Sequence, residues 1–159
     1  MLKSLPTTDE GTYGETNNTI DSLIHNQKQF PISDTMNKLF NGIQYKNLPI
    51  INIRVSQNNT ILTYTESNGV VKLIRSCGIE GFRNARKGTN VAAQSTAITF
   101  GTRTLENGVR SVRVRVRGLG PGRTSAIKGL QMAGLDVVSI TDSTPVSWSP
   151  PRPRKQRKL

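Results

Sequence analysis

From residue 50 onward, short apolar runs alternate with turn residues and predict three strands. Ile50–Val55 is rich in β-branched residues, and Thr60–Thr65 is a second such run after a turn at residues 58–59. An Asn-Gly pair at residues 68–69 predicts another tight turn, because both residue types tolerate positive φ angles. Residues 70–75 should therefore return as the third strand of an antiparallel meander.

A helix is predicted over residues 90–107, with Gly108 placed to end it. Large apolar residues recur every seven positions in this segment, which predicts one apolar face on a helix. We expect the buried face to consist of those residues and the small residues between them: Val91, Ala97, Ile98, Gly101 and Leu105.

Within residues 109–118, valines and arginines alternate from Val112 to Arg117, which predicts a strand with one residue type on each face. The outward row would consist of Arg113, Arg115 and Arg117. Such a row can protect a sheet edge from aggregation or can contact RNA, and the sequence leaves both explanations open.

A second helix is predicted over residues 123–133, with Ile127 and Leu130 inward and Gly134 at its end. It leads to a last, buried strand over residues 136–140. A three-strand meander followed by helix, strand, helix and strand predicts an α/β fold with a mixed sheet of about five strands flanked by helices.

Three segments are predicted along the chain. Residues 1–48 lack a sustained period and are interpreted as an extended N-terminal extension with a short helix near residues 34–40. Residues 49–145 form the α/β domain, and residues 146–159 form a basic tail rich in proline and arginine, which should be extended.

Charge is distributed unevenly between these segments. The 159 residues carry a net charge of +12, but residues 1–48 hold four lysines and five acids, whereas the rest holds eighteen cations and five acids. An excess of cations favours a polyanionic partner, because each neutralised phosphate releases counterions. The folded part and the tail are therefore the predicted nucleic-acid binders, and the extension is not.

The most distinctive motif is Gly-Leu-Gly-Pro-Gly-Arg at residues 118–123, between the arginine strand and the second helix. Glycines allow an RNA backbone to approach the main chain, and free amides at a helix start favour a phosphate. A plain tight turn is the alternative. The spacing matches neither glycine-rich nucleotide-binding motif, so we expect no nucleotide here.

A second candidate is the loop at residues 81–89, which combines Phe82 with Arg83, Arg86 and Lys87. Such a loop can place cations on phosphates while the aromatic ring stacks on a base or packs in the core. A solvated basic loop is the alternative. The tail carries five cations between residues 151 and 158, which favours threading along RNA over a nuclear-localisation signal.

Catalysis is poorly supported. The single histidine, His25, lies in the unpatterned extension, and the single cysteine, Cys77, excludes an internal disulfide. Only Glu66 and Asp142 sit at strand ends where carboxylates could converge on Mg²⁺, which leaves a metal-dependent nuclease or an NTP-binding assembly factor as the alternative function. We expect no membrane span, cofactor or small-molecule substrate.

Several short segments, in this order, resemble one known family. They are Asn58-Asn59-Thr60, Gly81-Phe82-Arg83, Arg86-Lys87-Gly88-Thr89, Ala92-Ala93-Gln94, Val116-Arg117-Gly118-Leu119-Gly120-Pro121-Gly122-Arg123, Ser125-Ala126-Ile127 and Ile140-Thr141-Asp142-Ser143-Thr144-Pro145. From residue 49 to the end, the chain is similar to the universal ribosomal small-subunit protein eleven. The resemblance implies a ribonuclease-H-like sheet, no enzymatic activity and a place on the subunit platform near the mRNA exit.

The family resemblance also implies partners: small-subunit rRNA, mRNA close by, and small-subunit proteins six, eighteen and twenty-one. The residues expected to contact RNA lie in loops, at a helix start and in the tail: Asn58, Asn59, Arg83, Arg86, Lys87, Gly88, Thr89, Arg117, Gly118, Gly120, Pro121, Gly122, Arg123, Ser125, Arg152, Arg154, Lys155, Arg157 and Lys158.

The amino-acid sequence of residues 74–82 and 154–159 resembles that of animal mitochondrial members of the family, which implies a location in the mitochondrial ribosome. Residues 1–48 contain no arginine and five acids, so no transit peptide is visible in them, and a removed presequence would reconcile the two observations.

Overall fold

The computed structural model describes residues 33–155. Residues 1–38 and 39–159 are separate units, and in the first the structure describes a short 3₁₀ helix, η1. The elements are η1 (Ser33–Asn37), β1 (Leu39–Phe40), β2 (Ile43–Gln44), η2 (Tyr45–Asn47), β3 (Ile50–Val55), β4 (Thr60–Thr65), β5 (Val71–Ser76), η3 (Asn84–Gly88), α2 (Asn90–Glu106), β6 (Ser111–Arg117), α3 (Arg123–Met132) and β7 (Asp136–Asp142).

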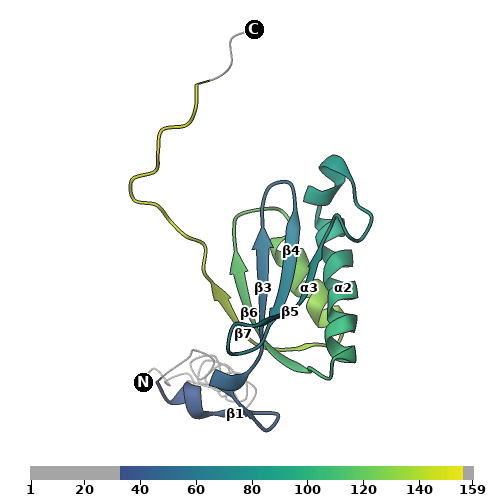
Figure 1. Cartoon of the computed structure of the whole chain (residues 1–159), viewed down its shortest axis with the longest axis vertical. Coiled ribbons are helices and arrows are strands. Elements are labelled where there is room, and N and C mark those ends of the chain that lie inside the picture. Colours follow the sequence, from purple (N-terminus) through teal and green to yellow (C-terminus); the bar gives the residue numbers. More distant parts are fainter. Residues whose placement is uncertain (1–32, 156–159) are drawn as a thin grey trace, which may run out of the picture. The chain divides into compact units, whose positions relative to one another are not determined.

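Five strands form the main sheet in the order β5-β4-β3-β6-β7 (Figure 1). The meander β3-β4-β5 is antiparallel, whereas β6 pairs parallel to β3 and to β7. The sheet is therefore mixed, as the sequence predicts, and β3 and β6 are inner strands. A separate two-stranded ribbon pairs β1 with β2.

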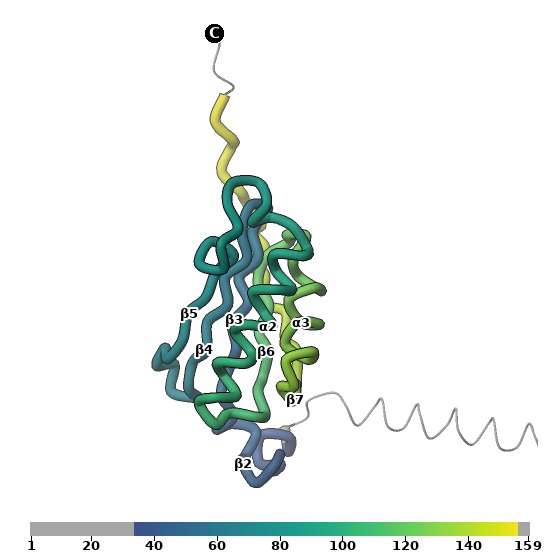
Figure 2. Tube along the Cα trace, turned by 90° about the vertical axis from the view of Figure 1, so that its right-hand side faces the viewer, coloured from purple at the N-terminus to yellow at the C-terminus, as the bar shows by residue number. Residues whose placement is uncertain are grey.

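Both helices cover the same face of the sheet (Figure 2). The core lies between these two layers and contains alternate residues of β3 and β6, among them Ile51, Ile53, Val114 and Val116, together with Phe100 of α2. The arginines of β6 project to the other face, because successive side chains in a strand point to opposite sides. That face has no helix over it in the described chain, and we call it the uncovered face.

The predicted elements are confirmed to within a few residues. The three meander strands, both helices and the β6 strand begin and end close to where the sequence pattern places them. Gly69, Gly108 and Gly134 all have positive φ angles, which explains why the one hairpin position and the two helix-end positions chosen from the sequence carry glycine.

The predicted buried face of α2 is only partly right: Ala97 and Gly101 are buried and Leu105 packs on the core, but Ile98 is half-buried and Val91 is wrong. Val91 is 70% exposed, and the buried residues are mostly small: Ala92, Ala93, Thr96, Ala97, Phe100, Gly101 and Thr104. Small residues dominate because α2 packs closely on α3: a Cβ atom on Gly129 would lie less than 3.0 Å from the Cβ of Ala97. The buried threonine hydroxyls donate to carbonyls one turn earlier, so they bury no unpaired donor.

The prediction of a buried last strand is also wrong. β7 is an edge strand of the sheet, and Ile140 is 54% exposed. Strand β7 also runs two residues beyond the predicted end, to Asp142. An edge strand has a neighbouring strand on one side only, so its side chains are less enclosed than those of an inner strand. The apolar sequence of β7 therefore did not establish that the strand is buried.

Residues 39–48, which the sequence assigns to the extension, pack on the domain. Leu48 and Tyr45 are buried, and the Tyr45 hydroxyl hydrogen-bonds with the Ser139 hydroxyl at 2.9 Å. Asn41 donates to the side chains of Ser111 and Asp136. This segment closes the end of the sheet at which β3 and β6 begin.

Candidate nucleic-acid interface

Loops from four parts of the chain emerge at one end of the main sheet. Because β3, β6 and β7 are parallel, their carboxyl ends lie together, and the pairs Arg54–Arg117 and Val116–Asp142 mark this end in the register. The helices α2 and α3 also begin here (Figure 1). We call this region the loop end; its loops are residues 56–59, 77–89, 118–122 and 143–145.

The turn between β3 and β4 is enclosed by glycines of two other loops. A Cβ atom on Gly118 or Gly120 would lie less than 3.0 Å from the carbonyl oxygen of Val55 or Ser56, respectively. On another loop, a Cβ atom on Gly88 would come equally close to the carbonyl oxygen of Gln57. Gly118 also has a φ of +102°, which other residues rarely adopt.

These contacts change the explanation of the glycine motif. The sequence suggested that its glycines expose the main chain to RNA. Instead, the positions that side chains would occupy on Gly118 and Gly120 face the β3–β4 turn, and that on Gly122 faces Thr60 and Ala93. Their first role is therefore to let three loops pack into one surface.

The β3–β4 turn is also fixed from within. The Ser56 amide donates to the Asn59 carbonyl at 2.9 Å, and the Asn59 amide donates to the Ser56 hydroxyl at 3.0 Å. Asn58 is exposed, while the side-chain oxygen of Asn59 is buried and accepts no hydrogen bond within the described residues. Asn58 and Asn59 thus lie at the loop end beside residues 88 and 118–120.

Arg123 folds back onto the protein. Its guanidinium donates to the Gly118 carbonyl at 3.0 Å and forms an ion pair with Asp142. Thr144 joins the same network, because its amide and hydroxyl both donate to Asp142, at 2.9 and 2.7 Å. These hydrogen bonds, from Thr144 first and from Arg123 second, lower the pKa of Asp142 to about 2.

The network gives Arg123 a different role from the predicted one. Its charge faces an ionised carboxylate, so Arg123 fixes the shape of the loop at residues 118–122 and ties it to the end of β7. The first turn of α3 begins after Gly122, whose lack of a side chain leaves no side-chain cap on the helix amides. Ser125 lies in that turn.

The second candidate loop carries cations without acidic partners. Arg83 and Arg86 are exposed, Lys87 is half-buried, and within residues 33–155 none of the three forms an ion pair. The nearby carboxylate, Glu80, lies 3.9 Å from Arg75. Thr89 caps α2, since its hydroxyl accepts from the Ala92 amide at 3.2 Å.

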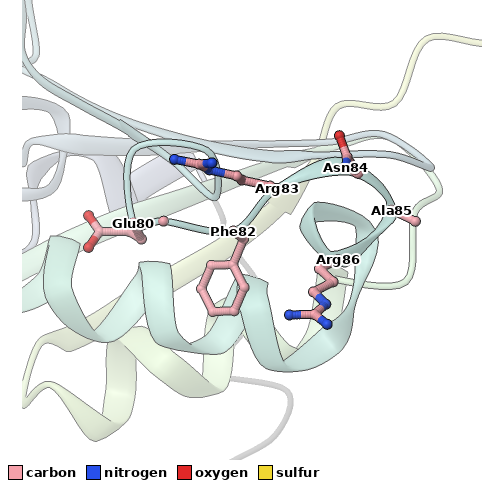
Figure 3. Close-up of a pocket in the computed structure, with 7 residues that line it drawn as sticks. Glu80, Phe82, Arg83, Asn84, Ala85 and Arg86 are labelled. Carbon is pink, nitrogen blue, oxygen red and sulfur yellow. The ribbon is translucent and has the colours of Figure 1, made fainter.

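A hollow of about 650 Å³ opens along this loop and is lined by residues 80–86 (Figure 3). The ring of Phe82 and the guanidinium of Arg86 point to one side of the loop, and Arg83 lies on the other side. Asn84, at the start of η3, has a φ of +50°, a conformation that asparagine tolerates better than most residues. The loop therefore presents cations in two directions.

Most of the residues predicted to contact RNA come together at the loop end: Asn58, Asn59, Arg83, Arg86, Lys87, Gly88, Thr89, Arg117, Gly118, Gly120, Pro121, Gly122, Arg123 and Ser125. The tail residues Arg152, Arg154 and Lys155 are exposed and belong to no helix or strand. Arg157 and Lys158 lie outside the described residues, as does His25.

Sequence reasoning missed Arg54. It is exposed, and it pairs in register with Arg117 across β3 and β6. Strand alternation shows that it points away from Ile53 and Val55, but no local pattern reveals that β6 lies beside β3.

The carboxylates of the nuclease alternative do not converge. Asp142 lies at the loop end, whereas Glu66 follows β4 at the other end of the sheet and pairs with Lys72 at 3.0 Å. Within the described part of the chain, no group of three or more histidine, cysteine or acidic residues could hold a metal ion. None of the helices in that part is both long and apolar enough to cross a membrane.

Comparison with known proteins decides the family. The sequence profile described as Ribosomal protein S11 matches residues 49–158. The chain belongs to the ribosomal protein S11 family. This membership confirms the resemblance found in the sequence, and S11 is a family of structural ribosomal proteins.

Two mammalian relatives are named small ribosomal subunit protein uS11m. The chain is 48% identical to the Mus musculus protein and 49% identical to the Bos taurus protein, over 118 residues in each case. The matches cover 74% of this chain but 62% and 60% of the relatives. The chain therefore spans about three-fifths of the length of these two relatives.

Proposed function

We propose that this S11-family chain is a structural, rRNA-binding protein of the small subunit of the mitochondrial ribosome, with no catalytic role. The names of its two mammalian relatives support the location and the subunit. The chain would support translation by holding rRNA in place at the platform near the mRNA exit, beside small-subunit proteins six, eighteen and twenty-one.

The observation that carries the RNA-binding part is the unpaired charge at the loop end. Arg83, Arg86 and Lys87 have no acidic partner among the described residues, and they lie on a surface whose loops pack closely together at glycines. A preformed cationic surface binds phosphates without first ordering its own backbone. The loop at residues 118–122 and the uncapped start of α3 extend the same surface.

The decisive experiment measures binding to transcribed mitochondrial small-subunit rRNA over a range of salt concentrations. Replacing Arg83, Arg86 and Lys87 together with alanine should weaken binding by about 100-fold at 0.1 M salt and lower the salt slope by about 2, since each phosphate contact contributes roughly 0.7–0.9 to that slope.

The matched control removes three exposed cations elsewhere, with Arg103, Arg110 and Lys128 replaced by alanine. It loses the same charge, and its salt slope should stay close to that of the unchanged chain. Equal losses in both variants would mean that net charge alone attracts the RNA, and an unchanged slope in the loop variant would exclude residues 83–87 from the interface.

The exposed tail residues Arg152, Arg154 and Lys155 form a second part of the proposed interface. No helix or strand holds them, so they would bind through charge and become ordered only on RNA. Their replacement with alanine should lower the salt slope by about 2 without changing thermal stability. A lower melting temperature would indicate instead that the tail packs on the domain.

A further inference from the structure

The uncovered face of the sheet carries a cluster of arginines that starts at the loop end, with Arg54 and Arg117, and continues along β6 to Arg115. Arg54 of β3 and Arg115 and Arg117 of β6 are all exposed and, by strand alternation, point away from the core residues between them. Arg54 and Arg117 are partners in register, so neighbouring strands about 4.8 Å apart hold two like charges side by side. We call these three residues the arginine ladder.

The ladder is not explained by protection of a sheet edge. The edges of this sheet are β5 and β7, whereas β3 and β6 are inner strands with neighbours on both sides. Arginines on inner strands do nothing to block edge-to-edge pairing. This removes the alternative that the sequence left open for the arginine row.

Nothing in the described chain neutralises the ladder. The ion pairs among residues 33–155 involve Lys72, Arg75 and Arg123, and none reaches the ladder. Like charges directly opposite each other in a sheet are destabilising. Arg113, two residues before Arg115 on β6, differs from the ladder because it has partners. It donates to the Leu48 carbonyl at 3.2 Å and lies over the Tyr45 ring at 4.9 Å.

The chemistry of the face favours a nucleic-acid backbone over a protein. Arginine forks bind phosphates in a bidentate way, and the neighbouring positions in register carry the hydrogen-bonding residues Asn52 and Thr141. Protein interfaces usually have an apolar centre with few charges, whereas nucleic-acid interfaces are polar and strongly positive.

We propose that the arginine ladder on the uncovered face binds the phosphate backbone of a second RNA segment, distinct from the segment at the loop end. The chain then bridges two RNA segments, one across the carboxyl ends of the strands and one along the sheet face. This inference goes beyond the proposed function, because the loop end could bind RNA whether or not the face does.

The test is hydroxyl-radical footprinting of transcribed mitochondrial small-subunit rRNA with the full chain. The face variant replaces Arg54, Arg115 and Arg117 with glutamine. It is compared with the loop variant of Arg83, Arg86 and Lys87 and with a control in which Arg103, Arg110 and Lys128 become glutamine. The face variant should lose protection at one set of nucleotides, keep the set that the loop variant loses, and show a salt slope lower by about 2.

Three outcomes would overturn the proposal. An unchanged footprint and salt slope in the face variant would show that the face does not bind RNA, even if an acidic protein neighbour is lost from reconstituted subunits. Loss of the same nucleotides in the face and loop variants would mean one continuous site. An equal loss of protection and of salt slope in the control variant would mean that net charge alone attracts the RNA at both sites.

A lysine variant at the three ladder positions separates charge from geometry. R54K/R115K/R117K keeps the charge but lacks the guanidinium fork, so it should retain the salt slope and bind several-fold more weakly. Affinity equal to that of the unchanged chain would overturn the bidentate contact. The melting temperature of each variant shows whether it is folded. If the triple glutamine variant is unfolded, the single variant R117Q is used in its place.

Discussion

The two ends of the sheet carry similar polar and cationic residues, but these residues differ in whether they have partners within the protein. At the end formed by residues 39–49 and the starts of β3 and β6, polar groups find partners inside the protein: Arg113 on the Leu48 carbonyl, and Asn41 on Ser111 and Asp136. At the loop end, Arg83, Arg86 and Lys87 have no ion-pair partner in the described chain.

The difference shows that a count of charges does not locate a binding surface. Arg113 and Arg117 occupy equivalent positions in the alternation of one strand, yet the first stabilises the fold and the second remains available. What separates them is residues 45–48, which lie beside Arg113 and supply carbonyl oxygens and an aromatic ring. Substitutions at the two ends of the sheet should therefore have different effects on stability and on RNA binding.

Gly118→Ala should damage the loop end most. The added Cβ would meet the Val55 carbonyl at less than 3.0 Å and would force a side chain into a φ of +102°. Strain and overpacking each cost roughly 1–3 kcal/mol, so we expect a loss of about 4 kcal/mol in the free energy of unfolding, measured by urea denaturation.

Gly108→Ala is the matched control for this change. Gly108 also has a positive φ, of +81°, but its added Cβ would meet open space. It should cost roughly 1–2 kcal/mol, from backbone strain alone. Equal losses at the two positions would show that the packing of residue 118 on the β3–β4 turn contributes nothing.

Leu48→Ala should have the largest effect at the opposite end. Leu48 is fully buried, and truncation of a buried leucine leaves a cavity that costs about 3 kcal/mol. The salt slope for rRNA binding should not change while the protein is folded, because no predicted RNA contact lies at this end. Leu119→Ala, at a residue that is 83% exposed, is the stability control and should be nearly neutral. An unchanged free energy of unfolding in Leu48→Ala would mean that residues 39–48 do not stabilise the domain.

Sequence patterns predicted the elements well because the relevant signals are local. Glycine ends both helices, and valine alternates with arginine along β6. The buried face of α2 was predicted only in part, because the apolar spacing suits a face of large residues, whereas the close approach of α3 selects alanine, glycine and threonine. The Leu48 partner of Arg113 and the Asp142 partner of Arg123 were missed for a similar reason, because each lies in a different element of the fold.

The candidate site was predicted in its residues but not in its internal geometry. The loop at residues 81–89 and the glycine motif do lie together, yet the glycines are explained by the carbonyls of Val55, Ser56 and Gln57, which no spacing reveals. Arg54 was missed because only the parallel register of β3 and β6 places it beside Arg117.

Arg113→Gln and Arg117→Gln should give opposite results. The first removes the hydrogen bond to Leu48 and the contact with Tyr45, so it should cost about 1–2 kcal/mol of unfolding free energy and leave the salt slope unchanged. The second should change stability by less than about 0.5 kcal/mol and lower the slope by about 0.7–0.9. Identical behaviour of the two variants would contradict the distinction between partnered and free arginines.

The smallest expected effect is the acid titration of Asp142. Hydrogen bonds from Thr144 and Arg123 hold the pKa of Asp142 at about 2, below the usual 3.8. Because the folded state lowers this pKa, the network's contribution to stability is fully present above pH 3.8 and is lost as the pH falls through about 2. Thr144→Val removes the hydroxyl donor and should raise the pKa toward 3.8, which NMR of the carboxyl carbon can follow. A pKa near 3.8 in the unchanged chain would mean that the network is absent in solution, and that Arg123 is free to bind RNA like Arg83 and Arg86.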